Sequence, residues 1–101
     1  MSADVRAAVM ANPAGGLIGV SEGLEGAPAR ELAGLAADLF SAADRALGDP
    51  AQQVEAQVAG GSVYAVRSAA RMLACVARRT ALPALVLYDL TVILREAEAG
   101  G

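Results

Sequence analysis

The pentapeptide Gly19-Val20-Ser21-Glu22-Gly23 matches G-x-S-x-G, the pattern around the nucleophilic serine of many hydrolases. That chemistry needs a general base beside the serine hydroxyl, and histidine is the usual one. The chain of 101 residues contains no histidine. We therefore interpret the pattern as a strand leading into a loop and expect no enzyme activity.

A second group of residues, Gly15, Gly16 and Gly19, is reminiscent of loops that hold phosphate through backbone N–H groups. The spacing matches neither the dinucleotide-binding pattern nor the P-loop pattern, and the chain has no lysine to hold a phosphate. The glycines follow Asn12-Pro13, which favours a tight turn. We therefore interpret this stretch as the turn of a hairpin.

The remaining reactive groups are sparse. Cys75 is the only cysteine, which excludes an internal disulfide and a cysteine-based zinc site, and we expect it to be a buried small apolar residue. Arg78 and Arg79, with Arg71 nearby, form the only basic cluster. An arginine finger is one interpretation, and a solvated strand end is the simpler one. We expect no cofactor and no metal.

The overall composition limits the possible partners. The net charge of -3 argues against nucleic acid, which needs a basic stripe. The longest apolar stretch, residues 81–94, is interrupted by Pro83, Asp89 and Thr91 and is shorter than the roughly 20 apolar residues of a spanning helix. With no signal-peptide pattern, we expect one cytoplasmic domain over residues 1–101 and no direct membrane insertion.

Hydrophobic periodicity predicts the elements that position these residues. The predicted strands and helices follow the chain as strands 4–11 and 17–22, helix 27–47, strands 53–59, 62–67 and 71–77, and helix 81–99. The short strand connections imply hairpins and an antiparallel sheet, with two helices covering at least one face. Strand 71–77 is apolar on both faces and is expected at the centre of the sheet, whereas strand 53–59 has one polar face that is expected to contact solvent. This is an α+β two-layer sandwich with a five-stranded antiparallel sheet.

The arrangement resembles a known family. The resemblance rests on the hairpin of residues 5–10 and 17–21 around Asn12-Pro13-Ala14-Gly15-Gly16, the amphipathic helix over residues 32–47 and three meandering strands. It resembles the roadblock family, the dynein light-chain relatives, whose bacterial members include the MglB type. The resemblance covers the core 4–77 and leaves helix 81–99 as an addition. Many members carry a helix before the first strand, and we expect none before residue 4 here.

The resemblance implies a profilin-like fold, a dimer and no catalytic residues. Members scaffold or regulate small Ras-like GTPases or serve as adaptors. We therefore expect a non-catalytic homodimer that acts on a small GTPase. The alternative is a small-molecule or lipid-responsive sensor domain on the same fold, which an apolar pocket between the helices and the sheet would favour.

Three surfaces are predicted interfaces. On helix 27–47, the small residues Gly34, Ala37 and Ser41 form a stripe, and two copies meeting antiparallel about Ala37 would bring Arg30 near Asp44 of the mate. Without such a contact, Asp44 is a solvated helix residue and the stripe reflects the alanine-rich composition.

The second surface is the side of helix 81–99 opposite its main apolar face, where Leu85, Tyr88 and Val92 lie three and four residues apart. Scattered exposed apolar residues are the simpler interpretation. The third is the strand that contains Val54, Ala56 and Val58, because the resemblance implies that this strand pairs with its own copy at the sheet edge.

Overall fold

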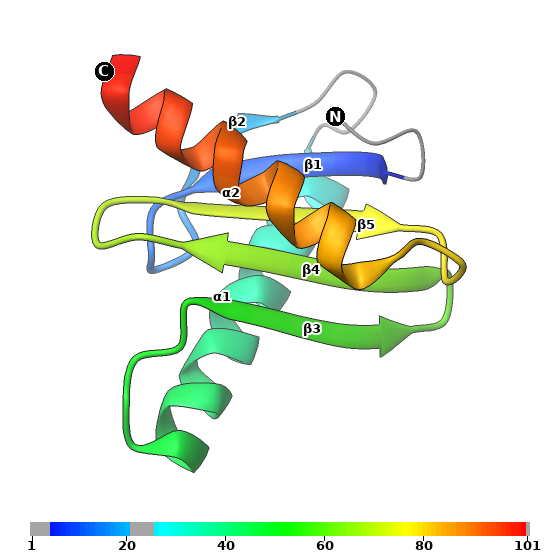
Figure 1. Cartoon of the computed structure of the whole chain (residues 1–101), viewed down its shortest axis with the longest axis horizontal. Helices are drawn as coiled ribbons and strands as arrows, with labels where there is room; N and C mark the ends of the chain where they lie inside the picture. The colour runs from blue at the N-terminus through cyan, green and yellow to red at the C-terminus, as the bar shows by residue number, and fades with distance from the viewer. Residues whose placement is uncertain (1–4, 21–25, 101) are drawn as a thin grey trace.

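The computed structural model describes residues 5–20 and 26–100. It contains a five-stranded antiparallel sheet and two helices in the predicted chain order (Figure 1). The elements are β1 (Val5–Ala11), β2 (Leu17–Val20), α1 (Ala27–Leu47), β3 (Gln53–Val58), β4 (Gly61–Arg67), β5 (Met72–Ala77) and α2 (Pro83–Gly100). Asp4, residues 21–22 of the second predicted strand and the Ser21 motif lie outside the described residues.

The strands lie in the order β2-β1-β5-β4-β3. The central position predicted for residues 71–77 is confirmed, because β5 lies between β1 and β4. The edge position of β3 is confirmed as well. Side chains of β5 are apolar on both faces because both faces are covered, whereas β3 alternates between exposed and half-buried positions.

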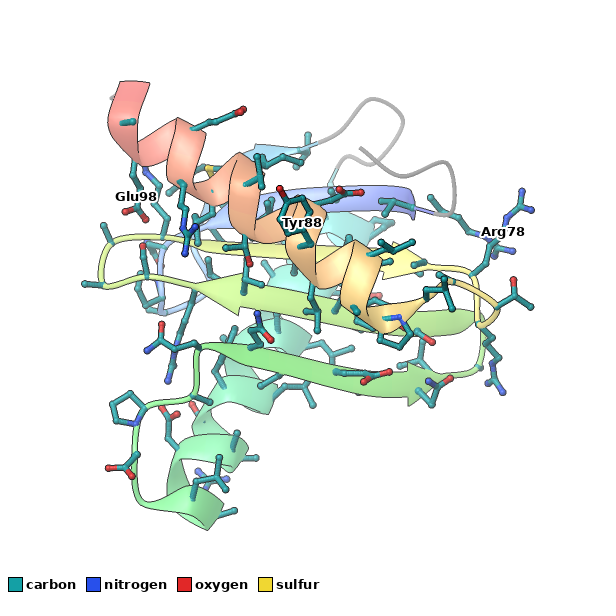
Figure 2. All side chains as sticks on the ribbon, in the orientation of Figure 1. Arg78, Tyr88 and Glu98 are labelled. Atoms are coloured by element: carbon teal, nitrogen blue, oxygen red, sulfur yellow. The ribbon has the colours of Figure 1, made fainter. Side chains whose placement is uncertain are left out.

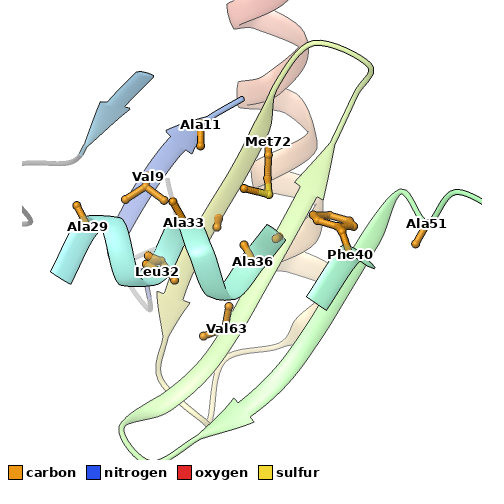
Figure 3. Close-up of a cluster of buried hydrophobic side chains, with 12 residues drawn as sticks. Val9, Ala11, Ala29, Leu32, Ala33, Ala36, Phe40, Ala51, Val63 and Met72 are labelled. Carbon is orange, nitrogen blue, oxygen red and sulfur yellow. The ribbon is translucent and has the colours of Figure 1, made fainter. Parts of the chain in front are cut away.

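The two helices lie on opposite faces of the sheet (Figure 1). One cluster packs α1 through Phe40 on the sheet beside Val63 and Met72 (Figure 3). The other packs α2 through Leu90 on the opposite face, beside Tyr64. The predicted sheet and helices are confirmed, and the sheet is the middle of three layers instead of one of two. Strands β4 and β5 carry apolar side chains on both faces of the sheet, so both faces must be covered.

Helix α1 has the predicted bounds, and local residues explain both of them. Pro28 lies in the first turn, where the missing N–H leaves no bond unmade. Gly48 ends the helix in the left-handed conformation (φ 79°), and its N–H donates to the Asp44 carbonyl oxygen at 2.9 Å. The last turns of α1 extend past the β3 edge of the sheet (Figure 1), and Leu47 there is 68% exposed.

Candidate interface at the β3 edge and the helix faces

The β3 edge presents unpaired backbone groups. The Arg67 N–H donates to the Gln52 carbonyl oxygen at 3.1 Å, just before β3 begins. Bonding alternates along an antiparallel ladder, and the β3–β4 register runs without a bulge from Gln53 to Val58. Alternate residues from 54 onward therefore bond β4. The backbone groups of Gln53, Glu55 and Gln57 face outward, toward any strand that adds to this edge.

The three residues predicted on this strand, Val54, Ala56 and Val58, alternate with the residues whose backbone groups face outward, so their own backbone groups bond β4. Val54, Ala56 and Val58 are half-buried, and Val54 and Val58 pack on the α1 face of the sheet. Their side chains lie next to the part of the edge that α1 overhangs. Reasoning from the sequence found the strand and missed the outward-facing residues, because only the hydrogen-bonding register identifies them.

The small-residue stripe on α1 has a neighbour within the chain. A Cβ placed on Gly15, in the β1–β2 turn, would lie 3.6 Å from the Ala37 Cβ and 3.9 Å from the Gly34 Cα. Gly15 has a φ of 98°, which favours glycine, so the turn comes close to α1 without side-chain bulk. Part of the close approach that small residues permit is therefore made inside the chain. Ser41 and Arg30 remain exposed.

Gly34 offers a test of the stripe. A Cβ added there would meet open space, so Gly34→Ala removes a poor helix former without a clash. We expect the isolated chain to gain about 1 kcal/mol in free energy of unfolding. If the stripe is an interface, the same methyl group weakens the dimer. Urea unfolding of dilute protein and sedimentation at higher concentration measure the two effects separately, and an unchanged dimer removes the stripe from the interface.

The prediction for Asp44 is corrected by an ion pair within the chain. Both carboxylate oxygens of Asp44 accept hydrogen bonds from Arg67 Nη2, at 2.6 and 2.7 Å, and Oδ1 also accepts from the Ala51 N–H at 2.8 Å. The interpretation of Asp44 as a simply solvated residue is therefore wrong, and its contact with Arg30 of a mate stays a prediction. Sequence reasoning missed Arg67 because no local pattern links residues 23 positions apart.

Arg67 connects three parts of the chain. Its Nε donates to the Ala51 carbonyl oxygen at 2.7 Å, and its guanidinium lies 4.4 Å from the centre of the Phe40 ring. We call Asp44, Arg67, Ala51 and Phe40 the Arg67 clamp. The clamp joins the end of α1, the start of β3 and the end of β4. It therefore sets how the projecting end of α1 lies relative to the β3 edge.

The clamp predicts a dependence of stability on pH. Hydrogen bonds from Arg67, and then from the Ala51 N–H, lower the pKa of Asp44. A carboxyl group whose pKa is lower in the folded state than in the unfolded state stabilises the fold at pH values above the ordinary aspartate pKa of about 3.9. This contribution is lost as the pH falls through the lower pKa of the folded state. We expect wild type to unfold at higher urea than Asp44→Asn at neutral pH, with the difference vanishing in strong acid. A difference independent of pH would contradict an ionic clamp.

The outer face of α2 carries the third predicted group. Leu85 is 58% exposed and Tyr88 is 67% exposed, and Val92 is half-buried. The opposite side of the helix is buried through Val86, Leu90 and Leu94. A groove of about 580 Å³ runs beside this face, between α2 and β3, and is lined by Gln53, Ala84, Leu87, Tyr88, Thr91, Val92 and Arg95.

The structure separates the predicted arginine cluster. Arg71 donates to the Ala97 carbonyl oxygen near the end of α2 (2.7 Å), whereas Arg79 donates to the Val58 carbonyl oxygen at the β3–β4 turn (2.5 Å). Cys75 is buried as predicted, and burial raises the pKa of its thiol to about 11. Among residues 5–20 and 26–100 no group of potential metal ligands gathers. No helix in these ranges has the length and apolarity to cross a membrane.

The five-stranded sheet between two helices is the fold of roadblock domains and of profilin. A roadblock/LC7 domain from Streptomyces avermitilis superposes with a TM-score of 0.82 at 22% identity, over 95% of this chain and 84% of that one. Myxococcus xanthus MglB gives a TM-score of 0.71 at 17% identity, over 96% and 85%. Schizosaccharomyces pombe profilin gives 0.62 at 15% identity, over 96% and 86%.

At these identities the superpositions establish the fold. The predicted resemblance to roadblock domains, the MglB type included, is confirmed at that level. The profilin superposition likewise supports the predicted profilin-like architecture. No protein-family model and no curated protein matches the sequence.

Proposed function

We propose that this protein is a non-catalytic homodimeric scaffold that regulates a small Ras-like GTPase in the cytoplasm. The observation that carries the proposal is the β3 edge, where outward-facing backbone groups lie beside a helix that extends past the sheet. An edge strand with free N–H and C=O groups is a template for a second strand.

In the proposed dimer, β3 pairs antiparallel with β3 of a second copy and joins two sheets into one. The projecting end of α1, with Leu47 exposed, then lies over the mate. Burying this leucine gives the dimer an apolar contact in addition to the backbone bonds. Ser41 is also exposed on α1 and lies six residues before Leu47, whereas Arg30 is exposed in the first turn of the same helix.

The roadblock fold and the similarity to MglB support a GTPase partner, which is what the resemblance to the roadblock family implies. A domain without catalytic groups regulates a switch protein by binding one of its conformations more tightly than the other. The test is capture from native lysate on immobilised protein, with GDP or a non-hydrolysable GTP analogue added, read by mass spectrometry. We expect one small GTPase to be enriched in one nucleotide state. Recovery of no GTPase in either state would contradict the proposal.

A second candidate, the ligand-responsive domain, has one observation in its favour. An apolar cleft of about 290 Å³ lies between α1 and the sheet, lined by Pro28, Glu31, Leu32, Leu35, Val58, Val63 and Val76. This volume is just below the roughly 300–1,000 Å³ of small-molecule sites. A fatty acid that raises the thermal midpoint of wild type, but not of Val63→Phe, would support this candidate over the scaffold.

A further inference from the structure

Leu47 lies on the apolar face of α1 but beyond the sheet that this face covers. It follows the buried Phe40 by seven residues, or about two turns, so both side chains lie on the face that packs on the sheet. Ala43 is the last residue of the helix that packs on the core, and Leu47 is 68% exposed. In Figure 2 the side chains at this end of α1 lie beyond β3, outside the sheet. Leu47 is therefore placed like a core residue, just past the edge of the sheet that would bury it.

An incompletely filled apolar cleft lies on the same face of the sheet, at the other end of β3. This is the cleft of about 290 Å³ between α1 and the sheet. On the sheet side it is lined by Val58, the last residue of β3, and by Val63 and Val76, which pair with each other across β4 and β5. Val58, Val76 and, on the helix side, Leu35 are only half-buried. The cleft thus presents apolar side chains that the chain itself does not fully cover.

The Arg67 clamp determines where along β3 the end of α1 lies. Asp44 accepts a hydrogen bond from the Ala51 N–H, and β3 begins two residues later at Gln53. Leu47 therefore projects past the edge near the start of β3, whereas the cleft lies at its end. A two-fold axis perpendicular to the sheet, at the middle of β3, exchanges these two ends. Such an axis brings the projecting leucine of each copy to the cleft of the other.

We propose that this cleft is the binding site for Leu47 of a second copy of the chain. The inference rests on the β3 pairing proposed above and names the site that the projecting end of α1 would occupy. From Ala43 to Leu47 the helix advances about 6 Å, which exceeds the spacing of about 4.8 Å between paired strands. Leu47 therefore extends across β3 of the mate toward the β4 and β5 residues that line the cleft. A small apolar molecule in the cleft would compete with this leucine.

Charged residues beside the two features are complementary. Glu31 is exposed at the cleft, and Arg45 is exposed at the projecting end of the helix. Their positions are 14 residues apart, which places them about 40° from each other on one side of α1. Neither forms an ion pair with another described residue of its own chain. The two-fold axis brings Arg45 toward Glu31 of the mate. Asp38 lies between them and Asp49 follows the helix, so these charges orient the contact, and apolar burial supplies most of its free energy.

Leu47→Ala tests the contact, because the wild-type side chain is mostly exposed in its own chain. We expect the dissociation constant of the dimer to rise about 100-fold, since each dimer loses two buried leucine side chains. The free energy of unfolding of dilute protein, measured in urea, should not change. Leu85→Ala is the matched control, because Leu85 is 58% exposed on α2, on the opposite face of the sheet. This variant should keep the wild-type dissociation constant in sedimentation.

Cross-linking between single-cysteine variants tests where Leu47 lies. Leu47→Cys and Glu31→Cys proteins, mixed to exchange copies and treated with a short bis-maleimide, should give covalent dimers. Cys75 is buried and does not compete. Neither variant alone should cross-link, because two copies of one position lie about 24 Å apart in the antiparallel contact, the helix length from residue 31 to residue 47. Leu82→Cys, at a position 62% exposed beside α2, is mixed with Glu31→Cys to measure the background.

The outcomes separate this contact from the proposed β3 dimer. Cross-linking above background, together with a weakened Leu47→Ala dimer, supports the Leu47 contact. A Leu47→Ala dissociation constant equal to that of wild type, or cross-linking no greater than background, overturns it. The β3 dimer still stands in that case if wild type is dimeric and Glu55→Pro, which removes an outward N–H of β3, is monomeric. A wild type that is monomeric at every concentration contradicts both the β3 dimer and the Leu47 contact.

Discussion

Replacing Glu55 with proline is expected to abolish the proposed β3 dimer while leaving the fold intact. Glu55 lies in the middle of β3, and its backbone N–H faces outward because the neighbouring residues bond β4. Proline has no N–H and is tolerated in an edge strand where the missing donor faces solvent. The variant therefore loses a donor to the second copy and no bond within the chain. Sedimentation measures the mass, and far-UV circular dichroism measures the fold.

Two further proline variants serve as matched controls. Ala56→Pro removes an N–H that bonds β4, so we expect it to cost about 1–3 kcal/mol of folding free energy as well as the dimer. Ala70→Pro lies in the exposed β4–β5 turn, where only a 3.4 Å bond to Ser68 is lost, and the dimer should persist. If the Glu55→Pro protein keeps the dimeric mass of wild type in sedimentation at low concentration, β3 does not form the dimer.

Replacing Arg67 with leucine is expected to give the largest loss of stability among the polar residues. The guanidinium donates to Asp44 and to the Ala51 carbonyl oxygen and lies over the Phe40 ring, and its side chain is only 17% exposed. Charge-assisted hydrogen bonds contribute about 1.5–3 kcal/mol each in such settings. We expect a loss of about 2–3 kcal/mol, measured by urea unfolding.

The loss of the clamp should also weaken the dimer. Arg67 sets the start of β3 against the end of α1, the two elements that we propose meet the second copy. Arg67→Lys keeps the charge but not the planar guanidinium geometry, so it should recover only part of the stability. Arg78→Leu, at an exposed position outside α1 and β3, controls for the loss of one arginine. If Arg67→Leu costs no more than Arg78→Leu, the clamp does not hold these elements together.

Local patterns in the sequence were sufficient for the elements of the fold. Helix α1 begins beside Pro28 and ends at Gly48 because each residue acts on the backbone within one turn. The apolar run of β5 predicts its central place, and the alternation of β3 predicts its place at an edge. The absence of histidine argues against the catalytic interpretation of Ser21, and the absence of lysine argues against the phosphate interpretation of Gly15.

Tertiary structure decided what local patterns do not encode. Asp44 looks solvated in the sequence, and only the folded chain brings Arg67 to its carboxylate. Gly34 looks like part of an interface, and only the fold brings Gly15 against the same helix. The outward groups of β3 depend on a hydrogen-bonding register that one residue of slip would reverse. Periodicity acts within a few residues of chain, whereas pairing, register and the choice of sheet face depend on contacts between segments distant in sequence.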